Sequence, residues 1–389
     1  MIKEATKPMM KASNKDRIFY SQVNDINATT LICIGGIHGN EPAGVNGLQK
    51  VISDIVVNDI TIKGNFYALF GNMNALKTNV RYKDFDLNRL WTKDEVESMC
   101  IDDDGNYEFE EKKEQCELYN TIKEICDSSF GDFVFVDLHT TSSPTVPFIT
   151  ISDSLNNRNL ASKFNIPIVL GIEEYLDGPL LSYINEFGHV SIGFEAGQHD
   201  DENSVFYCEA FIWMVMEKLG LVSKRDFEYL TCNRILNIEN GFYEIMYRHC
   251  LSESNQFKMK PGFKNFNPVL KHQSLANDGI SEVKSPLNGL IFMPLYQKQG
   301  EDGFFVVRKL SKFWLVISTV LRSLKFHQFL RLLPGINRHP VNDYCLVANR
   351  KIALFLTIKV FHLFGYRKKI IVDDKIHFIK RDRKVIPFT

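Results

Sequence analysis

The 389-residue sequence lacks several patterns that mark common classes of protein. Its eight cysteines are scattered and form no C-x-x-C pair, which favours reduced thiols over a disulfide framework. No run approaches the roughly 18–20 apolar residues that span a bilayer. The N-terminal stretch "MIKEATKPMMKASNKDR" has no apolar core of signal-peptide length. We therefore expect a cytoplasmic protein.

Signatures of phosphate binding and of serine hydrolases are also missing. The glycine-rich turn "GGIHGNEPAG" contains neither the G-K-[ST] of a phosphate-binding loop nor the spacing G-x-G-x-x-G. Glu41 in this turn would repel a phosphate group. No G-x-S-x-G elbow occurs. The C-terminal region contains no nucleic-acid-binding module, so we expect no nucleic-acid partner.

The composition is that of a globular protein, with an uneven distribution of charge. Hydrophobic residues make up 44% of the chain and charged residues 24%, which is ordinary for a soluble domain. The net charge is −1, but residues 321–389 carry 15 Lys and Arg against 4 Asp, a net of +11. The chain is therefore an acidic body with a basic tail.

Strand and helix patterns alternate along the first half of the chain. Runs of β-branched and aromatic residues occupy 29–37, 65–71, 132–140, 148–152, 166–171 and 189–197, and helical patterns occupy 41–55, 110–126, 154–164 and 202–221. This alternation predicts an α/β domain whose largely parallel sheet is covered on both faces.

The rest of the sequence does not continue this alternation of strands and helices. Short strands with Pro and Gly turns indicate a small β-rich domain, and residues 308–333 read as an amphipathic helix. On that helix Leu310, Phe313, Ile317, Val320, Leu321 and Leu324 share one face, and Lys312, Arg322 and Lys325 lie opposite. We predict an α/β domain at 1–224, a small β-rich domain at 225–308 and a basic helical C-terminal extension at 309–389.

Three side chains at predicted strand ends suggest a metal site. His38 and Glu41 leave the first strand as an i, i+3 pair, and His139 ends the strand at 132–140. The carboxyl edge of an α/β sheet is where binding sites form, and a catalytic zinc site needs three N or O ligands and one open position. Asp137 is placed either to orient a ligand from behind or to bind a helix N–H.

These motifs together resemble a known family. "GGIHGNE", "GNMNAL", "DLNR", "DLHTT" and "FEAGQ" occur in the order found in the succinylglutamate desuccinylase and aspartoacylase family, a branch of the zinc carboxypeptidases. The resemblance runs from about Leu31 to Arg308. It implies a three-layer α/β/α domain with a mixed sheet, a small β-rich domain that helps close the site, and one zinc ion per chain held by His38, Glu41 and His139.

The resemblance also assigns roles to residues beyond the metal. It implies that Glu195 in "HVSIGFEAGQH" is the general base, which takes a proton from the metal-activated water. Arg81 would stabilise the oxyanion, and Asn88 and Arg89 would bind the substrate carboxylate. The expected reaction is hydrolysis of the amide of an N-acyl amino acid, or of a similar small carboxylate-bearing amide.

The chain departs from the family pattern in two places. Phe304 and Phe305 stand where aspartoacylase has small-domain tyrosines. The segment "LLSYINEFG" contains no arginine, although the family uses one there for the side-chain carboxylate. Arg308 and Tyr183 are the candidate substitutes, so the acyl and amino groups of the substrate stay open.

Two other functions remain as alternatives. One is a zinc carboxypeptidase acting on peptides, and the other is a non-enzymatic membrane-binding or partner-binding protein with a relic site. The second would use the basic tail, where "NRKIALFLTIKVFHLFGYRKK" combines apolar and basic residues. For this segment the interruptions by Lys359 and His362 favour packing against the body over peripheral membrane contact.

Overall fold

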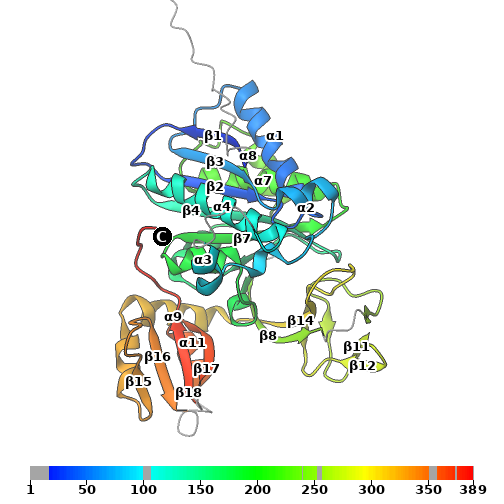
Figure 1. Ribbon diagram of the computed structural model, residues 1–389, viewed down its shortest axis with the longest axis vertical. Coiled ribbons are helices and arrows are strands. Elements are labelled where there is room, and N and C mark those ends of the chain that lie inside the picture. Colours follow the sequence, from blue (N-terminus) through cyan, green and yellow to red (C-terminus); the bar gives the residue numbers. More distant parts are fainter. Residues whose placement is uncertain are drawn as a thin grey trace, which may run out of the picture.

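A mixed eleven-stranded sheet runs through the body of the protein (Figure 1). The computed structural model describes residues 17–99, 107–238, 240–251, 256–349, 357–372 and 375–388. The strands lie in the order β1 (Ile18–Val23), β3 (Asn65–Phe70), β2 (Thr30–Gly35), β4 (Phe133–Thr141), β7 (Val190–Gln198), β5 (Phe148–Ile151), β6 (Ile168–Leu170), β8 (Phe242–Cys250), β14 (Asp302–Lys309), β13 (Gly289–Phe292) and β10 (Pro268–Val269).

The centre of the sheet is parallel and fully buried. Strands β3, β2, β4 and β7 pair in parallel, and every residue of β2 and β4 is buried. Such strands must be apolar on both faces, which is why they read as continuous hydrophobic runs. Strand β5 joins β7 in antiparallel orientation, so the sheet is mixed.

Helices cover both faces of this sheet and make three layers. One core contains α1 (Ala43–Val57), α5 (Leu155–Ala161), α7 (Asn203–Lys218) and α8 (Tyr229–Ile235). The core on the opposite face contains α4 (Glu110–Asp127) and α6 (Leu180–Glu186). The predicted α/β/α architecture with a mixed sheet is therefore confirmed.

The predicted small β-rich region continues this sheet at one end. Strand β8 pairs with β6, and β14, β13 and β10 follow it. A separate three-stranded sheet of β9 (Phe257–Met259), β11 (Ser274–Asp278) and β12 (Ser281–Lys284) lies in the same region. The domain boundaries at residues 224 and 308 stay predictions.

The C-terminal extension contains more strand than its sequence suggested. Helix α9 (Lys312–Ser323) and a 3-10 segment, η3 (Phe326–Leu332), lead into a four-stranded sheet. Its strands are β15 (Ile336–Arg338), β16 (Cys345–Asn349), β18 (Lys375–Lys380) and β17 (Tyr366–Val372), and helix α11 (Thr357–Leu363) precedes β17. The expectation of a helical extension missed these strands, because they are short and charged residues interrupt their apolar pattern.

Helix α9 buries little of the apolar face that its sequence suggested. Its buried residues are Ser318 and Arg322, whereas large apolar side chains are exposed at Phe313, Trp314, Val316, Val320 and Leu324. Of the three basic residues on the opposite face, only Arg322 is buried, and Lys312 and Lys325 are exposed. Ion pairs hold Arg322 in this buried position.

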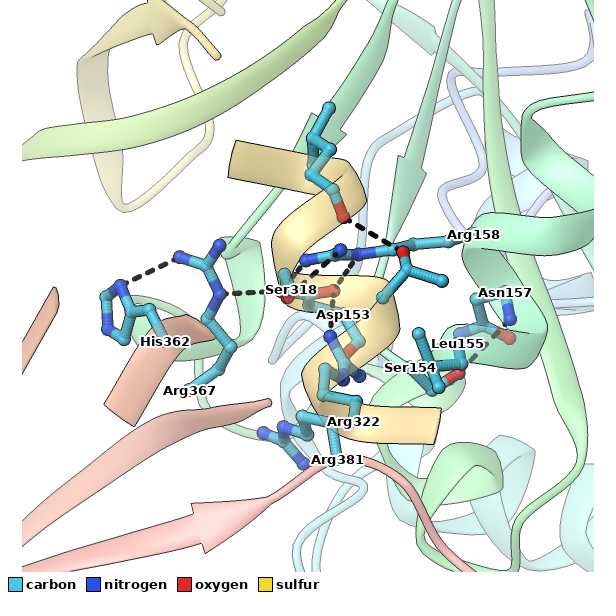
Figure 2. A network of polar contacts seen from close by, with 12 residues as sticks. Asp153, Ser154, Leu155, Asn157, Arg158, Ser318, Arg322, His362, Arg367 and Arg381 are labelled. Atoms are coloured by element: carbon cyan, nitrogen blue, oxygen red, sulfur yellow. Dashed lines mark hydrogen bonds and ion pairs between the residues drawn. The ribbon is translucent and has the colours of Figure 1, made fainter. Parts of the chain in front are cut away.

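Asp153 binds three buried arginines from distant parts of the chain (Figure 2). Its carboxylate accepts hydrogen bonds from Arg158 Nη2 at 2.8 Å, Arg322 Nη1 at 3.1 Å and Arg367 Nε at 2.7 Å. Burial raises the pKa of Asp153, but the three guanidinium charges outweigh it and hold the pKa well below the usual range. Helix α9 and strand β17 are thereby attached to the loop after β5.

The described part of the tail segment 349–369 packs against its own sheet. Phe361 of α11 is fully buried and stacks on Phe378 at a ring-centroid distance of 4.0 Å. Residues 350–356 of this segment lie outside the described residues. Within the part of the chain that the structure describes, no helix has the length and apolar character that crossing a membrane requires.

Replacing Asp153 tests the attachment of the extension. Asp153→Asn leaves three buried guanidinium groups facing a neutral amide, so we expect a loss of about 3–5 kcal/mol in the free energy of unfolding. Because the folded-state pKa is depressed, this contribution is present above the unfolded-state pKa of about 3.9 and is lost as the pH falls. Urea unfolding measures both effects.

The matched control is Asp343→Asn, which changes an exposed carboxylate of the same extension. It should alter the unfolding free energy by less than about 0.5 kcal/mol. Equal stabilities for the two variants would show that Asp153 does not hold the extension in place.

Candidate metal centre and active site

The turn after β2 is shaped by glycines that bring two predicted ligands together. Gly36 has a φ of 75°, which side chains with a Cβ rarely adopt. A Cβ on Gly39 would lie 2.3 Å from the carbonyl oxygen of Ala75, so the chain can pass there only without a side chain. Glu41 then lies just before helix α1, where the helix dipole favours a negative charge.

His38, Glu41 and His139 form one buried cluster at the carboxyl edge of the sheet. Glu41 Oε1 lies 2.9 Å from His38 Nδ1, and Glu41 Oε2 lies 3.0 Å from His139 Nδ1. One nitrogen or oxygen atom from each residue falls within 4.8 Å of the others. The structure therefore brings together the three residues that the sequence singled out.

Two carboxylates orient the imidazole rings from behind. Asp137 Oδ2 lies 2.7 Å from His139 Nε2, and Asp86 Oδ1 lies 3.1 Å from His38 Nε2. Of the two contacts predicted for Asp137, the structure shows the one with the candidate ligand His139. Asp86 was missed, although it belongs to the quoted motif "DLNR", because only the folded chain brings it to His38.

This arrangement fits a divalent metal ion. Nε2 of His139 contacts Asp137, and Nε2 of His38 contacts both Asp86 and Arg81 Nη2, the latter at 2.9 Å. Nδ1 of each ring therefore faces Glu41 and can bind metal. Burial lowers the pKa of His139, but Asp137 and Glu41 outweigh it and raise the pKa well above the usual value. A cation in this cluster would replace protons between the rings and Glu41. Two nitrogens and a carboxylate match the ligand set of catalytic zinc.

Glu195 lies beside this cluster on the neighbouring strand. In the parallel pairing of β4 with β7, Glu195 is the partner of His139. Its side chain is buried, and its Oε2 atom has no hydrogen-bond partner. Burial, with smaller contributions from Glu41 and Asp137, raises the pKa of Glu195 to about 8. A buried carboxylate with a free oxygen is suited to proton transfer.

Arg81 also lies at the cluster, where Asp86 holds it. Its Nη2 and Nε atoms donate to Asp86 Oδ2 at 2.8 and 3.2 Å, and Nη1 lies 3.5 Å from Glu41 Oε1. Burial lowers the pKa of Arg81, but the charges of Asp86 and Glu41 outweigh it and raise the pKa. Arg81 is therefore a fixed positive charge next to the candidate metal.

Arg89 and Asn88 lie on the other side of the same cavity. The Asn88 side-chain carbonyl accepts from the backbone of Leu180 at 2.9 Å. Arg89 is paired with Glu301 and Asp302, each at 3.4 Å, although its buried Nε lacks a well-formed hydrogen bond. These two carboxylates, which lie at the start of β14, were not predicted from the sequence.

All seven predicted site residues line one cavity of about 140 Å³. Apolar side chains form part of its wall, among them Ile151, Ile172, Leu176, Leu181, Leu295 and Phe305. Neither candidate substitute for the family's distal arginine lines this cavity. Arg308 is exposed and lies 3.7 Å from Glu244, and Tyr183 packs against Trp91, Phe187 and Phe388. Phe305 lines the cavity and Phe304 does not.

A second missed residue, His199, joins the cavity wall to the small β-rich region. Its Nδ1 atom lies 2.7 Å from Thr140 Oγ1, and its Nε2 atom lies 3.0 Å from Gln297 Oε1. Burial lowers the pKa of His199, which favours the neutral ring. The motif "FEAGQH" contains this residue, but its role depends on a contact across 98 residues.

The fold and the cluster define an α/β protein with a candidate metal site at the carboxyl edge of its sheet. Residues 27–207 match the model of the succinylglutamate desuccinylase/aspartoacylase catalytic domain. This match assigns residues 27–207 to the catalytic domain of the succinylglutamate desuccinylase/aspartoacylase family.

Individual relatives resemble shorter stretches of the chain. Succinylglutamate desuccinylase of Photorhabdus laumondii is 37% identical over 62 residues, 16% of this chain and 19% of that protein. The enzyme of the same name from Pseudoalteromonas atlantica is 28% identical over 117 residues, 30% of this chain and 32% of its own length. These matches therefore span a third or less of the relatives.

Solved structures share the fold over a longer region. Succinylglutamate desuccinylase of Vibrio parahaemolyticus has a TM-score of 0.55 at 14% identity, covering 74% of this chain and 84% of that one. An ectoine utilization protein of Ruegeria pomeroyi has a TM-score of 0.54 at 17% identity, covering 75% and 88%. At such identities the likeness establishes the fold alone.

The carboxylates behind the two histidines should control metal affinity. We expect Asp137→Asn and Asp86→Asn each to weaken zinc binding about 10- to 100-fold, because each change removes the partner that fixes an imidazole. Calorimetric titration with zinc measures the affinity, and Asp94→Asn, at an exposed position, serves as the control. Unchanged affinity in both variants, or stoichiometric zinc in His139→Ala, would contradict the assignment.

Proposed function

We propose that the protein is a zinc-dependent amidohydrolase that cleaves the amide of an N-acyl amino acid or a similar carboxylate-bearing amide. The observation that carries the proposal is the position of Glu195. Its buried carboxylate, with one free oxygen, stands in register with His139 and opens into the same cavity as Arg81 and Arg89. The relatives named succinylglutamate desuccinylase support this class of reaction.

Each residue around the cluster has a separate role in the proposed reaction. Zinc bound by His38, Glu41 and His139 would polarise the scissile carbonyl and lower the pKa of a water molecule. Glu195 accepts the proton of the attacking water and delivers it to the leaving nitrogen. Arg81, already fixed by Asp86, places positive charge where the tetrahedral oxyanion develops.

Arg89 and Asn88 recognise the substrate carboxylate. Arg89 lines the cavity, and its Nε atom lacks a well-formed hydrogen bond. Because Glu301 and Asp302 already neutralise part of its charge, a substrate without a carboxylate does not leave it unpaired. The energetic preference is therefore that of a charge-assisted hydrogen bond, about 1.5–3 kcal/mol, and not that of an uncompensated buried charge.

The far side of the cavity fits an uncharged group. Among the described lining residues, Arg81 and Arg89 are the two arginines and there is no lysine. Both have assigned partners, and Leu176, Leu181 and Phe305 add apolar surface to a wall whose other members, such as Thr150, Ser152 and Ser182, are uncharged. We therefore assign an uncharged acyl group to this chain. The cavity volume of about 140 Å³ favours a small molecule over the peptide of the carboxypeptidase alternative.

A panel of N-acyl amino acids tests the proposal. An N-butyryl amino acid with a free carboxylate should be hydrolysed with a kcat/KM about 10- to 150-fold above that of its amide. The kcat/KM of the N-butyryl amino acid should also exceed that of the N-succinyl derivative of the same amino acid. The second carboxylate of the succinyl compound meets no lysine and no unpaired arginine among the described residues of the cavity wall. Arg89→Ala should abolish the acid-over-amide preference by slowing the acid, with zinc content unchanged.

The matched control is Arg308→Ala, which removes an exposed arginine outside the cavity and should preserve all three rates. Equal rates on acid and amide in the unmodified protein would refute carboxylate recognition. Cleavage of longer peptides alone would favour the carboxypeptidase. A zinc-loaded protein that hydrolyses none of these compounds would favour the relic binding protein.

A further inference from the structure

A second cavity lies against the C-terminal extension. Its volume is about 760 Å³, within the usual range for small-molecule sites. Segments of η3, β15, β18 and residues 381–384 form one wall, and residues near α5 and α6 contribute another. None of its lining residues belongs to the cavity that contains the candidate metal centre.

The wall of this cavity is strongly cationic. Eight Lys and Arg side chains line it, together with His327, against two aspartates. One of those aspartates, Asp382, is already bound by Arg322, whose Nη2 and Nε atoms donate to it at 2.7 and 2.9 Å. The positive charge of the wall is therefore far from neutralised by the described residues that line it.

Two arginines in the wall hold donors that lack hydrogen-bond partners. Arg381, which Figure 2 shows next to the Asp153 network, is 1% exposed, and its Nε atom has no hydrogen bond. Glu173 Oε1 lies 3.8 Å from this Nε atom, beyond hydrogen-bond distance. The buried Nε of Arg383 is likewise without a hydrogen bond, and its guanidinium lies over the ring of Tyr344.

Lys380 contacts a neutral histidine and lies among other cations in the same wall. Its Nζ atom lies 3.2 Å from His327 Nε2. Burial, followed by the charge of Lys380, lowers the pKa of His327 to about 4, so the ring is neutral at pH 7 and can accept a hydrogen bond from the ammonium group. Burial also lowers the pKa of Lys380; the charge of Asp382 opposes this shift, and the charges of Arg322 and Lys325 add to it. Gathering lysine and arginine charges in this way is unfavourable unless an anion offsets them.

We propose that this cavity is a binding site for a phosphate-bearing ligand with two or more negative charges. Arginines present paired donors that match phosphate oxygens, and lysines add point charges. Its size and concave shape fit a small phosphorylated molecule or a phospholipid headgroup. The proposal does not depend on the amidohydrolase activity, because the two cavities share no residue.

The phosphate could belong to a small molecule or to a lipid headgroup, because the surface beside the cavity has features of a membrane-binding surface. The 3-10 segment η3 contributes His327 and Arg331 to the cavity wall, and it also exposes Phe326, Phe329 and Leu332. Exposed aromatic and aliphatic side chains next to cations are typical of proteins that bind the surface of an anionic bilayer. The experiment therefore contains one arm for each source.

The first arm is calorimetric titration of the full chain with inorganic pyrophosphate at low ionic strength. We expect saturable binding that is at least tenfold weaker in Arg331→Glu/Arg338→Glu and in Lys380→Gln. The matched control, Lys264→Glu/Lys271→Glu, changes two exposed lysines outside both cavities and should bind as the unmodified protein does. If pyrophosphate bound at the candidate metal centre instead, its affinity would be the same in all of these variants.

The second arm is sedimentation with vesicles of equal parts phosphatidylglycerol and phosphatidylcholine, compared with phosphatidylcholine alone. Binding to the anionic vesicles that the same cavity variants abolish, without binding of pyrophosphate, identifies a lipid headgroup as the source. Lys380→Gln should leave the melting temperature unchanged or raised, because it removes a partly buried charge that Arg322 and Lys325 repel. A lysine with a structural role would lower it.

Three results would overturn the proposal. The first is the absence of binding in both arms. The second is binding that is equal in all variants, which would place the ligand outside this cavity. The third is an equal loss of binding in the cavity variants and in the Lys264→Glu/Lys271→Glu control, which would show only general attraction between a basic surface and an anion.

Discussion

The parallel pairing of β4 with β7 is the constraint on which the candidate chemistry depends. It places Glu195 next to His139, so that a proton acceptor and a metal ligand enter one cavity from adjacent strands. A slip of one residue would turn Glu195 to the other face of the sheet. The apolar residues of β4 and β7, buried against helices on both faces, hold this register. Core packing thus determines the geometry of the site.

A second buried interaction attaches the basic extension to the same region. Ser152 lines the candidate active-site cavity, and the next residue, Asp153, binds Arg322 of α9 and Arg367 of β17. Glu173, in the segment that follows β6, accepts a hydrogen bond from the backbone of Asp153 at 2.9 Å, and Ile172 beside it lines the cavity. The acidic body and the basic tail therefore meet at an ion-pair network that adjoins the wall of the candidate active site.

The sequence predicted the parts of the structure that local patterns determine. The buried strands, the helices between them, and the cluster of His38, Glu41 and His139 follow from hydrophobic runs and from the common edge at which parallel strands end. The positions of Glu195 and Arg81 beside the cluster also agree with the prediction from the family motifs. Their chemical roles remain proposals.

The sequence could not predict features that depend on distant partners. Asp86 behind His38, and Glu301 and Asp302 at Arg89, are ordinary acidic residues until the chain folds. Helix α9 has a regular amphipathic pattern, but its Arg322 is buried because it binds Asp153, which lies 169 residues away in the sequence. The four-stranded sheet of the extension was not predicted, because its strands are short and contain charged residues.

The most direct test is hydrolysis measured as zinc is returned to metal-free protein. Chelator-treated protein should be inactive on the N-acyl amino acid that is hydrolysed best. Its rate should rise in proportion to added zinc and stop rising at one ion per chain. Glu195→Gln should bind the same amount of zinc and be slower by about 10²–10⁴-fold. Undiminished hydrolysis by metal-free protein, or near-normal turnover by Glu195→Gln, would contradict the account.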